Sequence, residues 1–133
     1  MYNLFLKFPN FTDKCLTFSY DDGTIHDKRL VELFSKYGVK ATFNINSELT
    51  VNNPNRLTMN ELYNLYNSNG MEVAVHGEYH LWPTKVPSAL AMKEFLNDRI
   101  NIEKDFNAIT RGMAYAFGDY NDEIVEILKK VGR

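Results

Sequence analysis

Residues 17–23 read Thr-Phe-Ser-Tyr-Asp-Asp-Gly, an apolar, β-prone run that ends in two adjacent carboxylates and a glycine. We interpret Cys15–Tyr20 as a buried strand, with Cys15 as a small buried residue. A second apolar run, Met71–Val75, also predicts a strand, and it ends in His76-Gly77-Glu78-Tyr79-His80. A carboxylate and two imidazoles can hold a divalent metal and leave a position open for water, while a second carboxylate can accept a proton. The two strand ends therefore predict the chemistry of metal-assisted hydrolysis.

Around these two runs the sequence alternates between predicted strands and predicted helices. Apolar residues recur at three- and four-residue spacing in the helical segments, and turn residues separate the elements. The predicted strands are Cys15–Tyr20, Ala41–Asn46, Met71–Val75 and Gly112–Phe117. The predicted helices are Asp27–Tyr37, closed by Gly38, a second helix that the capping box Thr58–Glu61 opens and Gly70 ends, Ser88–Phe106, and a last helix capped by Asn121. The positions of the longest helix that we expect to face the core are Met92, Phe95, Leu96, Ile102 and Phe106.

Alternation of this kind predicts an α/β fold, in which helical crossovers join parallel strands. Functional groups in such folds gather at the carboxyl ends of the strands. Asp21 and Asp22 follow the first predicted strand, and His76 follows the third. His80 lies in the loop beyond, and Phe117 ends the fourth strand. We therefore expect the candidate groups on one rim of the sheet.

The composition of the 133 residues is that of one globular domain, and it restricts the classes of partner. The net charge of −2 leaves no basic patch for nucleic acid. The single cysteine excludes an internal disulfide, and no run reaches the length of a membrane span. Residues 1–11 lack the basic and apolar regions of a signal peptide, so the expected location is the cytoplasm, or the cell surface or exterior if the chain is a fragment.

Each candidate residue also has a purely structural interpretation. An Asp-Asp-Gly sequence is typical of a turn, and a pair of histidines four residues apart also occurs in surface loops. His26 precedes the first predicted helix, where a polar cap or a solvated side chain is the default, so we do not assign it to a metal. Glu78 is expected to point to solvent. Trp82 is either a stacking surface in a cleft wall or a packing anchor for its loop.

Three segments resemble motifs of the polysaccharide deacetylases, the NodB-homology group. Tyr20-Asp21-Asp22-Gly23 is similar to the first motif of that family. Residues 76–80, with two histidines separated by three residues, are similar to the second, and residues 112–121, Gly-Met-Ala-Tyr-Ala-Phe-Gly-Asp-Tyr-Asn, resemble a variant of the third. The resemblance covers about Cys15 to Asn121, and it implies the first half of an incomplete (β/α) barrel.

The resemblance also implies an activity and roles for individual residues. The family removes N-acetyl groups, or in some members O-acetyl groups, from carbohydrates, so the implied partner is an acetylated carbohydrate polymer or oligomer. Asp21 would be the general base that activates water. The implied ligands of one divalent metal ion, usually zinc, are Asp22, His76 and His80. The positions implied to contact the oxyanion or the substrate are Phe117, through a backbone N–H near it, Tyr115 and Trp82.

The chain departs from the family pattern at two places. Ala114 stands where the third motif usually carries an arginine, and Arg111, three residues earlier, is not expected to reach Asp21 in its place. The later motifs, which supply a tryptophan-lined wall and the histidine that protonates the leaving amine, have no match in residues 1–133. We therefore expect residues 1–133 to be a catalytic domain truncated at its C-terminus, with open sheet edges that favour a homo-oligomer. Two alternatives stay open: a catalytically incomplete module of the same fold that binds metal or carbohydrate, and a small-molecule amidohydrolase.

Overall fold

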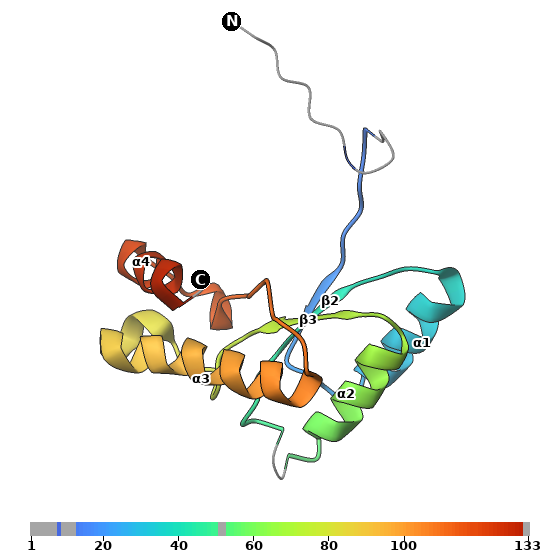
Figure 1. Ribbon diagram of the computed structural model, residues 1–133, viewed down its shortest axis with the longest axis horizontal. Helices are drawn as coiled ribbons and strands as arrows, with labels where there is room; N and C mark the ends of the chain where they lie inside the picture. The colour runs from blue at the N-terminus through green and yellow to red at the C-terminus, as the bar shows by residue number, and fades with distance from the viewer. Residues whose placement is uncertain (1–7, 9–12, 51–52, 132–133) are drawn as a thin grey trace, which may run out of the picture.

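The computed structural model describes residue 8, residues 13–50 and residues 53–131, with the backbone alone at residue 131 (Figure 1). The elements in chain order are β1 (Ser19–Asp21), α1 (Asp27–Tyr37), β2 (Thr42–Ile45), α2 (Met59–Ser68), β3 (Glu72–Val75), the 3-10 helix η2 (Pro83–Lys85), α3 (Ser88–Phe106), the 3-10 helix η3 (Ala116–Gly118) and α4 (Asp122–Val131). The three strands form one parallel sheet in the order β1-β2-β3. Figure 1 shows α1 beside α2 at the right of the strands and α4 along α3 at the left.

Caps set the ends of the helices where the sequence predicts them. α1 ends at Gly38, whose φ of 65° lies in the left-handed region that glycine tolerates. α2 begins at a complete capping box, in which the Thr58 side chain accepts from the Glu61 N–H and the Glu61 carboxylate accepts from the Thr58 N–H. α4 begins after Asn121, whose Oδ1 accepts the N–H of Ile124 at 2.9 Å.

Two clusters of buried side chains pack the helices against the sheet and against one another. In the first, the ring of Phe43 on β2 stacks on Tyr66 of α2 with centroids 4.4 Å apart. The Tyr66 hydroxyl donates to the buried Asp27 at 2.5 Å, so the polar end of this core is paired. The second cluster joins α3 to α4 through Ala91, Phe95, Ile124 and Ile127. α3 also packs on β3, and this contact brings it next to the loop after that strand.

The α/β fold with parallel strands is confirmed, but the first strand is shorter than predicted and Cys15 is exposed rather than buried. The register explains both differences. Ser19 pairs with Thr42, which is the first residue of β2. Residues before Ser19 therefore extend past the start of the neighbouring strand, and Cys15 has no sheet to cover it.

The fourth predicted strand, Gly112–Phe117, is wrong. Within the described residues this segment makes one parallel bridge, between Met113 and Val75. β3 ends at Val75, so little strand remains to pair with, and the chain then turns into η3, where Phe117 has a left-handed φ of 59°. The bridge still brings residues 112–114 to the end of β3.

α3 has the predicted bounds, but two of its five predicted inward positions are exposed. Met92 and Leu96 are 40% and 38% exposed, whereas Phe95 and Ile102 are buried as expected. The buried face also holds the acidic residues Glu94 and Asp98, which bind the loop after β3. Among the described residues, no helix is both long and apolar enough to cross a bilayer.

Candidate metal centre

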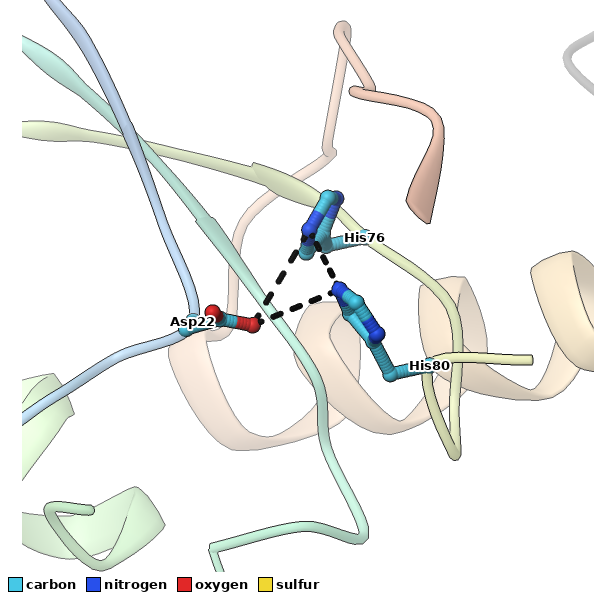
Figure 2. Close-up of side chains that lie close together, drawn as sticks. All are labelled: Asp22, His76 and His80. Carbon is cyan, nitrogen blue, oxygen red and sulfur yellow. Dashed lines mark hydrogen bonds and ion pairs between the residues drawn. The ribbon is translucent and has the colours of Figure 1, made fainter. Parts of the chain in front are cut away.

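Three side chains that could bind metal converge at the carboxyl ends of β1 and β3 (Figure 2). Asp22 follows β1, His76 follows β3 directly, and His80 lies four residues further on. The two imidazole Nε2 atoms are 3.1 Å apart. Asp22 Oδ1 lies 3.6 Å from His80 Nε2 and 3.9 Å from His76 Nε2. The residues that the sequence predicts as ligands therefore point toward one another.

The chemistry and spacing of these atoms fit one divalent ion. Bonds of about 2.0–2.2 Å place two ligand atoms of a tetrahedral ion about 3.3–3.6 Å apart, close to the three separations above. Two imidazole nitrogens and one carboxylate oxygen suit zinc and related ions, and three protein ligands leave a position open. That these residues bind a metal stays a prediction, which the geometry allows.

A hydrogen bond orients His76 for this role. His76 is buried, and its Nδ1 lies 3.0 Å from the carbonyl oxygen of Ala114. Because a carbonyl only accepts, Nδ1 carries the proton, and the lone pair of Nε2 faces Asp22 and His80. Burial, with the adjacent His76 imidazole, lowers the pKa of His80 below its ordinary value. This shift favours the neutral form of the His80 ring, which is the form that binds metal.

Two buried carboxylates of α3 hold the backbone of the histidine loop. Asp98 Oδ2 accepts the N–H groups of His76 and Gly77 at 3.0 and 2.9 Å, and its Oδ1 accepts that of Ser47 at 2.8 Å. Burial raises the pKa of Asp98 to about 6. Glu94 Oε1 accepts the N–H groups of Tyr79 and Leu81 at 2.8 and 3.1 Å. The sequence analysis missed both acids, although their four-residue spacing places them on one face of the helix.

A glycine is required where this loop passes α3. Gly77 has a φ of 92°, and a Cβ at this position would lie 3.0 Å from Glu94 Oε1. His80 also has a left-handed φ, of 56°.

Glu78 was expected to point to solvent, but it is half-buried and accepts a hydrogen bond from Asn97 Nδ2 at 3.0 Å. The reason is that α3 packs against the loop and offers it polar partners.

Asp21, the candidate base, lies beside the three ligand atoms. Its Oδ2 is 4.0 Å from His76 Nε2, and its side chain is 49% exposed. Asn44 of β2 donates from Nδ2 to Asp21 Oδ1 at 2.8 Å. In the described part of the chain, this buried amide rather than Arg111 contacts the base. A polar residue inside the apolar run 41–46 was the sequence feature that could have indicated Asn44.

Arg56 contacts the metal-ligand candidate itself. Its Nη2 donates to Asp22 Oδ1 at 2.9 Å, and its Nη1 donates to the Asp22 carbonyl and to Asn46 Oδ1. The arginine comes from the segment that precedes α2, 34 residues from Asp22. Nothing in the sequence near Arg56 indicates this contact.

The aromatic candidates belong to two different stacked pairs of rings. The ring of Phe117 is 4.3 Å from His80 and stacks on Trp82 at 4.0 Å. Lys85 Nζ lies 3.8 Å from the centroid of Trp82, and because the stacked ring fills one face of the indole, the ammonium takes the other. This arrangement favours the packing role of Trp82. Tyr115 stacks on Tyr120 instead, and His26 is exposed at the start of α1.

Comparison with known proteins gives a family and a fold. The family model described as polysaccharide deacetylase matches residues 9–133. Among solved structures, Streptococcus pyogenes deacetylase PplD in complex with acetate is similar with a TM-score of 0.85 and 24% identity, over 91% of this chain and 54% of that one. The family 4 carbohydrate esterase from Streptomyces lividans in complex with acetate is similar with a TM-score of 0.76 and 20% identity, over 90% of this chain and 60% of that one.

A third similar structure is a protein described as a pseudoenzyme. BA3943 from Bacillus anthracis, a CE4 family pseudoenzyme, is similar with a TM-score of 0.75 and 20% identity, over 87% of this chain and 40% of that one. No curated protein sequence matches this chain. The chain thus spans about half the length of the structures that it matches, and these likenesses establish its fold.

Proposed function

Because this chain belongs to the polysaccharide deacetylase family, we propose that it is a metal-dependent hydrolase that removes N-acetyl or O-acetyl groups from a carbohydrate polymer or oligomer. The observation that carries the proposal is the convergence of Asp22, His76 and His80, whose ligand atoms lie within 4.8 Å of one another, beside Oδ2 of Asp21. Residues 1–133 would then be one deacetylase-like catalytic domain.

In this proposal the three converging side chains hold one divalent ion, and zinc suits them best. When bound, such an ion polarises a carbonyl and lowers the pKa of water. Asp21 accepts the proton of the attacking water at Oδ2, the oxygen that lies 4.0 Å from His76 Nε2, while its Oδ1 accepts the Asn44 amide. That hydrogen bond holds the Asp21 side chain in place beside the three proposed ligand atoms.

The substrate would lie over the rim that Phe117 borders. η3 turns there, and the Phe117 ring lies against His80, so the backbone of this turn is next to the proposed metal centre. We propose that an N–H of this turn stabilises the oxyanion of the acetyl group. Trp82 and Tyr115 are proposed only as more distant substrate contacts, since each ring is already stacked on another.

Replacing the base tests the proposed reaction. We expect Asp21→Asn to leave zinc binding nearly intact and to lower acetate release from an acetylated chito-oligomer by about a hundred- to ten-thousand-fold. Asp105→Asn is the matched control, because Asp105 is exposed on α3. Equal acetate release by wild type and Asp21→Asn would refute the role of Asp21.

A catalytically incomplete module that binds metal or carbohydrate is the second candidate. Full activity would need a histidine that protonates the leaving amine. His26 is the one histidine of residues 1–133 that the proposed metal does not use, and it is exposed at the start of α1, which supports this candidate. Zinc binding without acetate release from wild type would favour this candidate. Self-association is a further proposal, and light scattering of the purified chain is the measurement that decides it.

A further inference from the structure

Arg56 donates three hydrogen bonds, two of them to the proposed metal ligand Asp22 and one to Asn46. We propose that Arg56 is a positioning residue, which fixes the Asp22 carboxylate in the orientation that binds metal. The inference rests on the proposed metal site, and it adds a residue to which neither the sequence motifs nor the comparisons assign a role. It predicts that the affinity for metal depends on the shape of the arginine side chain and not on its charge alone.

The guanidinium group binds both the side chain and the main chain of Asp22. Nη2 donates to the carboxylate Oδ1 at 2.9 Å, and Nη1 donates to the main-chain carbonyl of the same residue. Oδ1 is also the oxygen that faces the two imidazoles, at 3.6 Å from His80 and 3.9 Å from His76. The Arg56 side chain is only 13% exposed, so its orientation is restricted by packing. A carboxylate oxygen has lone pairs for both an N–H donor and a metal.

The backbone of Asp22 explains why such a restraint is needed. Asp22 has a φ of 83°, a left-handed conformation that residues with side chains rarely adopt. Residues 55–57 pair with this turn: Ile25 N–H donates to the Asn55 carbonyl at 3.1 Å, and Leu57 N–H donates to the Gly23 carbonyl at 3.0 Å. Arg56 is therefore anchored to the same turn whose side chain it restrains.

Asn46 extends this restraint to the histidines. Asn46 is fully buried, and its Oδ1 accepts from Arg56 Nη1 at 2.8 Å. Its Nδ2 donates to the carbonyls of His76 and Gly77 at 3.0 and 2.8 Å. A continuous chain of hydrogen bonds thus joins the carboxylate ligand to the backbone of an imidazole ligand. Groups behind the ligands that hold them in this way typically change metal affinity by about 10–100-fold.

The charge of Arg56 has the opposite effect on a cation. A guanidinium near the site repels a divalent ion, so its removal would by itself strengthen binding. Here, however, the charge is paired with Asp22 at 2.9 Å and bound by two carbonyl-type oxygens, which reduces its field at the site. We therefore expect the loss of positioning to exceed the gain from removing the charge.

Zinc titration of the whole chain, with a competing chelator, separates these two effects. We expect Arg56→Ala to weaken zinc binding by about 10–100-fold. Arg56→Lys keeps the charge but not the planar fork, and we expect it to weaken binding as well. Arg29→Ala is the control, because Arg29 is exposed on α1, where it pairs with Glu32, and we expect unchanged affinity. Circular dichroism checks that each variant is folded. If Arg56→Ala does not fold, Arg56→Lys provides the test.

The visible spectrum of bound cobalt gives a second readout, because it reports the geometry of the ligands and not the stability of the fold. We expect both Arg56 variants to alter the wild-type cobalt spectrum and Arg29→Ala to leave it unchanged. If Arg56→Ala binds zinc as tightly as wild type or more tightly, or if Arg56→Lys matches wild type in affinity and spectrum, the positioning role is wrong. If wild type binds neither ion, the proposed metal site fails, and the role of Arg56 fails with it.

Discussion

His80→Ala removes one of the three proposed ligands and gives the sharpest test of the metal centre. The His80 Nε2 atom lies 3.1 Å from that of His76 and 3.6 Å from Asp22 Oδ1, so an ion between them would lose a direct bond. Zinc sites with four ligands bind the ion with a free energy of about 10–16 kcal/mol, which is about 3 kcal/mol per ligand. Loss of one ligand therefore corresponds to about a 100-fold increase in Kd.

Thermal unfolding at a fixed free zinc concentration measures this change. At 100 times the wild-type Kd, binding stabilises the fold by about 2.7 kcal/mol, while a variant with a 100-fold higher Kd gains about 0.4 kcal/mol. The 133 residues have an unfolding entropy of about 0.28 kcal/mol/K. We therefore expect zinc to raise the Tm of wild type by about 10 °C and that of His80→Ala by about 1–2 °C, each relative to its own metal-free form.

His26→Ala is the matched control, since His26 is exposed at the start of α1 and is not part of the proposed site. We expect it to keep the full rise in Tm. An equal rise in wild type and His80→Ala would show that His80 is not a ligand. The absence of any rise in wild type would refute the metal centre itself.

Three further predictions concern pH, the base and stability. Acidification should release zinc as protons compete for the His80 imidazole, and because burial lowers the pKa of His80, dialysis followed by metal analysis should show that zinc is retained to a lower pH than an unburied imidazole would allow. Asn44→Asp would replace the amide that donates to Asp21 with a second carboxylate, and it should lower acetate release because the proposed base loses the donor that orients it. Thr58→Ala removes the cap of α2 and should lower the free energy of unfolding by about 1 kcal/mol in urea titration, without effect on zinc affinity.

The features that the sequence predicts well are those determined by neighbouring residues. Gly38 and Thr58 mark helix ends through local hydrogen bonds, and both are found where predicted. Asp22 and His76 lie directly after strands, so the parallel arrangement of the sheet is enough to bring them together. The error in the first strand arose because its length depends on where β2 begins, at Thr42, and not on its own composition.

The residues that the sequence analysis missed all depend on partners from distant segments. Arg56 reaches Asp22 across 34 residues, and Asn44 reaches Asp21 across 23. Asp98 lies on the buried face of α3, where an apolar residue would be expected, because it binds amide groups of two other segments. Periodicity identifies the helix, but it gives no information about which groups the buried face must bind.

The attachment of the histidine loop to α3 has a consequence for its motion. The amides of Gly77, Tyr79 and Leu81 are bound by side chains of α3, and the amide of Glu78 is bound by the main-chain carbonyl of Glu94. Local fluctuation of the loop is therefore not enough to expose these amides to exchange with solvent deuterium, since they must first separate from the helix. Their exchange rates should be close to those of the helix interior and slower than is usual for a loop, so the ligands would already be held in place before an ion arrives.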